Sequence, residues 1–411
     1  MNLLLLNHYA GTPELGMEYR PYYLAREWVR LGHRVRIVAA DFSHVRTRQP
    51  PPGTQVIDGI EYQWLPTPAY RGNGVGRLRN VMAYLSQTWA MADELARDVR
   101  PDAVIASSTY PMDNWVARRI AQAAARAGVR ARHVYELHDL WPLSLIELAG
   151  MSPWHPFALV CQSAEDAAYR HCDLVVSMLP KVHPHVTARG LDLRKLAIVP
   201  NGISPEEWQG APAPLRGDVA AALAAAREGE RVVVGYAGSM GLPNALDHLL
   251  DAAKRLADAP LGFVLVGDGH ERERLARRIA DEGLSRVALL PPIPKAQVRA
   301  FLAAIDIAFI GWQRVPIYRF GIAPNKLMDY MMAGKAVLHA VEAGNDPVGD
   351  ARCGLTVPPE DPAAIAEGLK GLAGLRAADR RAMGERGKAY VLRHHAYPVL
   401  AQRFIAALGG C

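Results

Sequence analysis

A segment in the last third of the chain combines a glycine, small residues and a lysine in an order typical of an anion-binding loop. Residues 320–337 read FGIAPNKLMDYMMAGKAV. Pro324 suits the first turn of a helix, because its fixed φ fits there and its missing N–H is not needed. A helix N-terminus offers free N–H groups and a partial positive charge, and Lys326 adds a full charge. The segment therefore predicts a diphosphate site, although a surface helix with a solvated lysine would give the same pattern.

Two polar residues, His138 and Asp139, follow a strand-like run at residues 132–137. Ligands of parallel α/β sheets bind at the carboxyl ends of strands, so both residues are well placed to meet one. Imidazole also exchanges protons near neutral pH. A single histidine is more often structural, but a His-Asp pair at a strand end favours a functional role.

The composition and the remaining motifs exclude several classes of function. The net charge of +6 is weak evidence for an anionic partner, and the basic residues are too scattered for nucleic-acid binding. The four cysteines show no CxxC or zinc spacing and indicate reduced thiols. The chain has no DxD pair, GxSxG elbow or Walker loop. We therefore expect no metal and no bound cofactor. A signal peptide and a membrane-length apolar run are also lacking, which predicts a cytoplasmic protein.

A basic amphipathic stretch is the main surface feature of the sequence. Residues 62–92 hold no carboxylate but include Arg71, Arg77 and Arg79. At helical spacing, one face would carry Leu78, Val81, Met82, Leu85 and Trp89. Such a segment can lie on an anionic membrane, with the three arginines facing the lipid. The alternative is that the apolar face packs on the core of a domain.

Strands alternate with helices along the whole chain, which is typical of parallel sheets. The first half opens with a buried strand at residues 3–6, and a loop with Gly11 and Gly16 follows. This loop is not GxGxxG, so a dinucleotide site is not favoured. The second half repeats this order, with a strand at 232–236 before the loop at 237–244.

A chain of 411 residues is too long for one ordinary core. We predict an α/β protein with two doubly wound, Rossmann-like domains that face a central cleft. The expected boundaries are 1–205 for an acceptor-side domain and 206–390 for a nucleotide-sugar-binding domain. A C-terminal helix within 391–411 would cross back to the first domain.

The order of these motifs resembles the retaining, metal-independent GT-B glycosyltransferases of family four. The resemblance covers essentially the whole chain and rests on six features: the first glycine loop, residues 138–139, the PNG at 200–202, the loop at Gly238, the GDG at 267–269, and PNKLMDYMMAGK. Residues 16–33, GMEYRPYYLAREWVRLGH, more narrowly resemble WbuB-like enzymes, which add an N-acetylated deoxysugar during O-antigen or capsule assembly.

The resemblance implies a role for each matching residue. His138, Lys326 and Asp329 would be the catalytic set, with Lys326 on the diphosphate and Asp329 on the nucleotide ribose. Glu18 and Arg20 are candidate acceptor contacts. The donor would be bound by Gly11, Gly16, Asp139, Gly238, Ser239, Asn244, Gly267, Asp268, Pro292, Ile293, Gly321, Ile322, Ala323, Pro324 and Asn325.

The sequence departs from the family pattern at the diphosphate and the donor sugar. Gly321 stands where the first carboxylate of the E-x7-E motif is usual, and Asp329 replaces the second glutamate. The usual arginine and lysine after the first strand of the second domain are Ser239 and Asn244. Lys326, with Arg314 or Arg319, would have to supply the missing charge. A lost sugar-binding carboxylate fits a donor that lacks a hydroxyl.

The resemblance implies transfer, with retention, of an N-acetylated hexosamine, with a 6-deoxy sugar as one option, from a UDP-sugar. The acceptor would be a polyprenyl-diphosphate-linked saccharide, as in O-antigen and other surface polysaccharide biosynthesis. The enzyme would then act as a peripheral protein on the cytoplasmic face of the inner membrane. Two alternatives remain: a nucleotide-sugar epimerase of the same architecture, and an inactive carbohydrate-binding relative.

Overall fold

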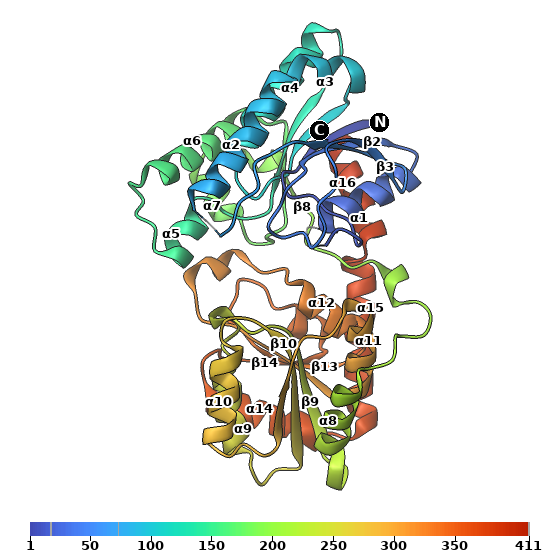
Figure 1. The fold of residues 1–411 in the computed structure, drawn as a ribbon, viewed down its shortest axis with the longest axis vertical. Coiled ribbons are helices and arrows are strands. Elements are labelled where there is room, and N and C mark those ends of the chain that lie inside the picture. The colour runs from blue at the N-terminus through green and yellow to red at the C-terminus, as the bar shows by residue number, and fades with distance from the viewer. Residues whose placement is uncertain (17–18, 73, 410–411) are drawn as a thin grey trace. The chain divides into compact units, whose positions relative to one another are not determined.

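The computed structural model describes residues 1–16, 19–72 and 74–409. The chain divides into two compact units, which are drawn in Figure 1. Unit 1 comprises Met1–Asn201 and Tyr397–Cys411, and unit 2 comprises Gly202–Ala396. The chain therefore passes from unit 1 to unit 2 after residue 201, whereas the sequence predicts this boundary after residue 205. It returns to unit 1 at residue 397, whereas the sequence predicts the return at residue 391. The N–H of Ile203 bonds to the carbonyl of His395, and this pairing joins both ends of unit 2.

Unit 1 is built on a largely parallel sheet with the strand order β3-β4-β2-β1-β5-β6-β7-β8. Only β3, which is antiparallel to β4, breaks the parallel pattern among the described pairs. The neighbours β1 and β5 mark the point where the strand order reverses, and such a point is where α/β sheets bind ligands. The strands are β1 (Asn2–Leu6), β2 (Arg34–Ala40), β3 (Gly53–Ile57), β4 (Ile60–Leu65), β5 (Ala103–Ala106), β6 (Arg132–Leu137), β7 (Leu174–Ser177) and β8 (Leu196–Ile198).

The buried leucines of β1 show how both faces of this sheet are covered. Leu3 and Leu5 pack in one cluster, with Trp28 and Phe404, while Leu4 and Leu6 pack in another, with Tyr84 and Val116. The alternation follows from the two-residue period of a strand. The helices of unit 1 are α1 (Tyr19–Arg30), α2 (Val75–Ala90), α3 (Ala92–Val99), α4 (Asp113–Arg126), α5 (Leu143–Ala149), α6 (Pro156–His171), α7 (His183–Ala188), η1 (Leu193–Lys195) and α16 (Tyr397–Gly409).

Unit 2 has the strand order β11-β10-β9-β12-β13-β14, which is the doubly wound order of nucleotide-binding domains. Its order reverses between β9 and β12, and the described pairs are parallel. The strands are β9 (Val232–Ser239), β10 (Leu261–Asp268), β11 (Val287–Leu290), β12 (Ile307–Gly311), β13 (Ala336–Ala340) and β14 (Gly354–Val357).

Helices cover both faces of this second sheet. One cluster joins it to α9 and α14, and another joins it to α8, α11 and α12. The α-helices are α8 (Gly217–Arg227), α9 (Leu246–Arg255), α10 (Arg272–Asp281), α11 (Lys295–Ala304), α12 (Asn325–Met332), α13 (Pro347–Ala351), α14 (Pro362–Gly374) and α15 (Ala377–His394). The 3-10 turns are η2 (Pro205–Trp208), η3 (Glu228–Glu230), η4 (Leu242–Asn244) and η5 (Pro316–Phe320).

The helix α12 forms where the sequence predicts it, with a one-residue difference at its start. Pro324 is the N-cap residue, with φ −76° and ψ 131°, so the helical turn begins at Asn325. Gly334 adopts φ +66° just after the helix, as expected for a terminating glycine. Among the described residues, no helix is long and apolar enough to span a membrane.

Candidate active site

In unit 1, a buried polar cluster lies at the carboxyl ends of β5 and β6. The hydroxyl of Ser107 donates to Glu136 Oε2 at 2.6 Å and lies 3.0 Å from His138 Nε2. The same His138 nitrogen is 3.2 Å from Glu136 Oε2. Asn7, at the end of β1, ties the neighbouring strand to the cluster by donating to the carbonyl of Ser107 at 2.6 Å. His138 therefore lies one strand from the switch point, held by Ser107 after β5 and by Glu136 of β6.

Glu136 is fully buried and is held in its ionised form by Arg20. The Arg20 Nε donates to Glu136 Oε1 at 3.0 Å, and its two other nitrogens donate to the carbonyls of Pro200 and Val199 at 2.6 and 2.8 Å. Burial acts to raise the pKa of Glu136, but the charge of Arg20 and the contacts with His138 outweigh it and lower the pKa to about 2. The Arg20–Glu136 ion pair thus fixes the carboxylate that contacts His138.

The two residues expected on the acceptor side have different outcomes. Arg20 is buried at 5% exposure, and its guanidinium donates to Glu136 and to two carbonyls of unit 1. These contacts give Arg20 a structural role, and its expected contact with the acceptor stays a prediction. Glu18 lies outside the described residues.

Asp139 is occupied by its own loop. Its carboxylate accepts from the N–H of Leu140 at 2.8 Å, from Trp141 Nε1 at 3.1 Å and from the hydroxyl of Ser144 at 2.7 Å. A carboxylate with three local donors orders the turn into α5. The expected donor contact of Asp139 therefore has a competing structural explanation.

The first glycine loop is shaped by packing within unit 1. Gly16 has φ +108°, and a Cβ there would lie 2.8 Å from the backbone nitrogen of Thr47. Only glycine tolerates both the conformation and the contact. The carbonyl of Gly11 accepts from the hydroxyl of Tyr62 at 3.2 Å.

In unit 2, Lys326 extends from the first turn of α12 to the carboxyl end of β9. Its Nζ donates to the hydroxyl of Tyr236 at 2.6 Å and to Asn244 Oδ1 at 3.0 Å. The side chain passes over Gly238, where a Cβ would lie 2.5 Å from Lys326 Cε. Burial lowers the pKa of Lys326 to about 7. The structure thus brings together three predicted donor-site residues, Gly238, Asn244 and Lys326.

Tyr330 fixes the helix that carries this lysine. It lies one turn after Lys326, and its hydroxyl accepts from the N–H of Ala237 at 2.9 Å. Tyr236 also donates to the carbonyl of Ser239, so its hydroxyl is held on one side while it accepts from Lys326 on the other. Sequence reasoning missed both tyrosines, because a tyrosine in an apolar strand or helix looks like a core residue.

The segment before α12 is held by an asparagine that the sequence did not single out. Asn345 accepts from the N–H of Ile322 at 2.7 Å and donates to its carbonyl at 3.1 Å. The Ile322 N–H is therefore engaged by a side chain of unit 2, and its expected contact with the diphosphate stays a prediction. Gly321, with φ +95° and ψ 170°, adopts a conformation that is essentially restricted to glycine. Ala323, Pro324 and Asn325 follow directly and lead into the helix.

Asp329 is the most perturbed carboxyl group of unit 2. Burial raises its pKa to about 7; Lys295 opposes this rise and Glu207 adds to it. Lys295 and Glu207 themselves form an ion pair at 2.8 Å. A carboxyl group whose pKa lies near 7 can be charged or neutral at neutral pH. It can therefore accept a hydrogen bond from a polar ligand or donate one to it.

The β9 and β10 strand ends approach each other closely at two glycines. Gly267 pairs with Gly238, and Asp268 pairs with Ser239. A Cβ on Gly267 would lie 1.9 Å from the carbonyl oxygen of Gly238, so no larger residue fits. The carboxylate of Asp268 accepts from the N–H of Gly269 at 2.9 Å.

Pro292 and Ile293, which are expected to contact the nucleotide base, already contact other residues of unit 2. The carbonyl of Pro292 accepts from Arg216 at 3.0 Å, and Ile293 packs against an apolar cluster. No group of three or more His, Cys, Asp or Glu suited to a metal ion occurs within the described part of the chain.

Comparisons with known proteins identify both halves of the chain. Residues 16–202 match the family described as glycosyl transferase 4-like domain, and residues 231–374 match glycosyl transferases group 1. The chain is a glycosyltransferase. Both matches favour a transferase over the epimerase alternative.

Solved structures show that this glycosyltransferase has the GT-B fold. Sucrose-phosphate synthase of Thermosynechococcus elongatus is 16% identical with a TM-score of 0.72, over 99% of this chain and 98% of that chain. HepE of Anabaena, in complex with UDP, is 17% identical with a TM-score of 0.65, over the full length of both chains. WaaG, a glycosyltransferase involved in lipopolysaccharide biosynthesis, is 15% identical with a TM-score of 0.65, over 99% and 100%. The prediction of two Rossmann-like domains is confirmed.

A curated relative matches a shorter region. A protein named as a colanic acid biosynthesis glycosyl transferase, WcaI of Escherichia coli strain K12, is 27% identical over 111 residues. This alignment covers 27% of each chain. The glycosyltransferase superfamily is thus supported.

Proposed function

We propose that this glycosyltransferase takes its sugar from a nucleoside diphosphate sugar with uridine as the base. The observation that carries the proposal is the position of Lys326. Its side chain extends from the N-terminal turn of α12 to Tyr236 in β9, at the switch point of the second sheet. A buried lysine and a helix N-terminus together favour a diphosphate. The structures of HepE in complex with UDP and with UDP-glucose support a donor of this class.

We infer transfer with retention and without a metal ion, as the resemblance to family four implies. The bond between the anomeric carbon and the diphosphate oxygen breaks, and a bond from that carbon to the acceptor oxygen forms on the same face. The acceptor proton passes to the departing diphosphate oxygen. Lys326 meets the charge that develops on this leaving group. The same resemblance assigns the donor sugar to His138, which Ser107 and Glu136 orient within unit 1.

The donor sugar in this proposal is an N-acetylated, 6-deoxy hexosamine. Gly321 has no side chain to bind a sugar hydroxyl, and the WbuB-like character of residues 16–33 points to the same donor class. The acceptor is a polyprenyl-diphosphate-linked saccharide in surface polysaccharide synthesis. WaaG is described as acting in lipopolysaccharide biosynthesis and WcaI in colanic acid biosynthesis, and both descriptions support a role in surface polysaccharide synthesis. The enzyme then works at the cytoplasmic face of the inner membrane.

Ligand-dependent thermal stability tests the donor assignment. A nucleotide that binds only the folded state raises its stability by mass action, so micromolar binding gives a measurable rise in Tm. We expect UDP and UDP-N-acetylhexosamines to raise the Tm of the wild type and much less that of Lys326→Ala. The matched control is Lys370→Ala, which alters an exposed lysine of unit 2. No response to any nucleotide would contradict the proposal.

A product assay tests the reaction itself. With a donor and a prenyl-diphosphate-linked sugar, NMR of the product should show the donor's anomeric configuration, and EDTA should leave the rate unchanged. Inversion at the anomeric carbon would contradict retention. Conversion of the donor sugar without any acceptor would instead support the epimerase.

A further inference from the structure

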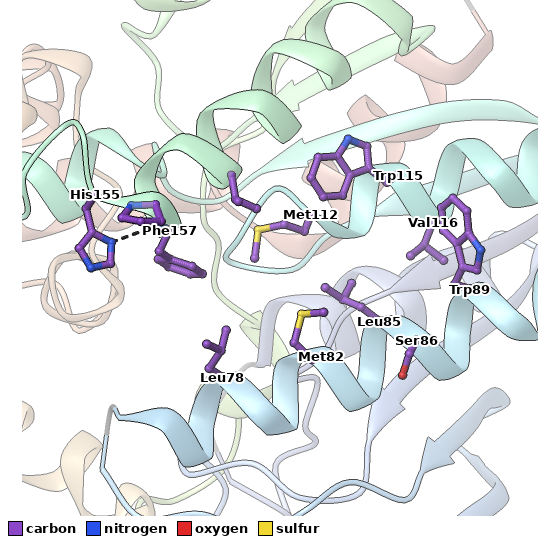
Figure 2. A pocket seen from close by; sticks show the side chains of 12 residues that line it. Leu78, Met82, Leu85, Ser86, Trp89, Met112, Trp115, Val116, His155 and Phe157 are labelled. Atoms are coloured by element: carbon purple, nitrogen blue, oxygen red, sulfur yellow. Dashed lines mark hydrogen bonds between the residues drawn. The ribbon is translucent and has the colours of Figure 1, made fainter.

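Unit 1 contains an apolar groove away from the polar cluster around His138. Its volume is about 710 Å3, and Figure 2 shows that its walls come from α2, the start of α4 and the start of α6. Its apolar lining includes Leu78, Met82, Trp89, Trp115, Phe157 and Val160. Pockets of this size, about 300–1,000 Å3, are typical of small-molecule sites.

The face of α2 that the sequence singles out is divided between the core and the groove. Val81 is buried and packs with Tyr110 and Met112, as the core-packing alternative expects. Leu78, Met82 and Trp89, however, remain 45, 55 and 45% exposed. These three lie four and seven residues apart, so they form one stripe along the groove. A contiguous exposed apolar surface of this kind marks a binding site.

The charges around the groove favour an anionic ligand. Residues 62–92, which include α2, have no carboxylate, and residues 148–164 have no Asp, Glu, Lys or Arg. Arg71 and Arg79 are exposed near the start of α2. Arg77 donates to the hydroxyl of Tyr9 at 3.0 Å, and its guanidinium lies 5.4 Å from the centre of that ring. A cation therefore links the groove helix to the loop that follows β1.

Two connections join the groove to the candidate active site. Asn80, on the inner side of α2, bonds to His8 at the end of β1, with 2.6 Å between Oδ1 and Nε2. The loop after β5 contributes Ser107 to the contact with His138 and Met112 to the groove. Residues next to the groove wall in the chain, Asn80 beside Leu78 and Ser107 in the same loop as Met112, thus contact the strand ends of unit 1.

We propose that this groove binds the isoprenoid chain of the acceptor lipid. The lipid diphosphate lies beside Arg77, and the saccharide lies at the carboxyl ends of β1 and β5. A hydrocarbon chain fits better than a peptide, because a peptide backbone would bury polar groups against a lining that offers them few partners. This inference rests on the proposed function, which supplies a polyprenyl-diphosphate-linked acceptor.

Direct binding of farnesyl diphosphate tests the groove without any need for turnover. Inorganic diphosphate serves as the reference, and each calorimetric titration is run both without UDP and with saturating UDP, which blocks the nucleotide site. We expect the wild type to bind farnesyl diphosphate at least about tenfold more tightly than diphosphate. The variant Leu78→Gln/Met82→Gln should lose that difference. The matched control is Leu193→Gln, since Leu193 is also 45% exposed and lies in unit 1 outside the groove.

The outcomes distinguish the groove from the proposed function. Equal binding of farnesyl diphosphate and diphosphate, or equal weakening by the groove and control variants, would overturn the groove assignment even if UDP binds normally. Loss of binding to phosphatidylglycerol vesicles in the groove variant, with farnesyl diphosphate binding intact, would also overturn it and assign the surface to the bilayer. Failure of UDP to raise the Tm tests only the donor site, because farnesyl diphosphate is titrated without UDP as well.

Discussion

The ε-amino group of Lys326 lies 2.6 Å from the hydroxyl of Tyr236 and 4.1 Å from the centre of its ring. The ring face is electron-rich and the hydroxyl oxygen accepts a hydrogen bond, so Tyr236 stabilises the ammonium form and fixes its position. The family positions for an arginine and a lysine hold Ser239 and Asn244 in this chain, and Asn244 contacts Lys326 too. Asn244, which stands at one of these two positions, thus helps to orient Lys326.

Nucleotide binding should depend on pH through Lys326. Its pKa is lowered to about 7 in the free protein, and a bound diphosphate would raise it by favouring the ammonium form. Affinity for UDP should therefore fall as pH rises above 7, by up to about tenfold per pH unit. Calorimetry in buffers of different ionisation enthalpy should detect proton uptake at pH 8. The Lys326→Met variant should bind weakly and take up no proton, and uptake retained in it would assign the proton elsewhere.

The same lysine should shape the stability of the free protein. Its pKa is lower when folded than in the unfolded chain, where it is about 10.4, so the unfolded state binds more protons between these values. The wild type should therefore gain stability relative to Lys326→Met as pH rises from 7 toward 10. Urea unfolding at several pH values measures the difference. A constant difference across this window would mean that Lys326 is not perturbed in the folded protein.

Gly238 should be needed for the path of the Lys326 side chain. In Gly238→Ala, the new Cβ would lie 2.5 Å from Lys326 Cε, so the lysine must move from its contacts with Tyr236 and Asn244. We expect UDP affinity to fall about tenfold, which corresponds to about 1.4 kcal/mol. Gly217→Ala is the control, because a Cβ there meets nothing within 4 Å. Unchanged UDP binding in Gly238→Ala would contradict the assigned position of Lys326.

Removal of Arg20 should destabilise unit 1 strongly. Arg20→Ala leaves the buried carboxylate of Glu136 without its cation, which typically costs about 3–5 kcal/mol. Arg194→Ala should have little effect on the free energy of unfolding, because Arg194 is 90% exposed in its pair with Asp192 and solvent screens the interaction. Chemical denaturation measures both values. A similarly small loss of unfolding free energy in Arg20→Ala and Arg194→Ala would show that the burial of Glu136 does not depend on Arg20.

A carboxylate introduced at position 321 should change donor preference. Gly321 has φ +95° and ψ 170°, so any side chain there is strained by about 1–3 kcal/mol. Gly321→Ala is therefore the control for Gly321→Glu, because both carry the strain and only one adds a carboxylate. We expect the glutamate variant to favour donors with a 6-hydroxyl relative to the alanine variant. Identical donor profiles in the two variants would contradict a sugar contact at this position.

The sequence predicts the architecture well because the local signals agree. Leu3 to Leu6 form an uninterrupted apolar run, as a strand buried on both faces requires, and this run is β1. Gly334 marks the end of α12 because a positive φ after a helix favours glycine. Such signals depend on neighbours in the chain, so they can be read without the fold.

The partners of the candidate site were decided by tertiary structure alone. Arg20 meets Glu136 across 116 residues, and Lys326 meets Tyr236 across 90. No local pattern specifies such pairs, because the topology of each sheet brings them together. The sequence by itself determined the strand–helix order, the glycine loops and the helix that carries Lys326. The tertiary structure decided that Arg20 neutralises a buried carboxylate, that Asn345 occupies the Ile322 amide, and that burial perturbs Lys326 and Asp329.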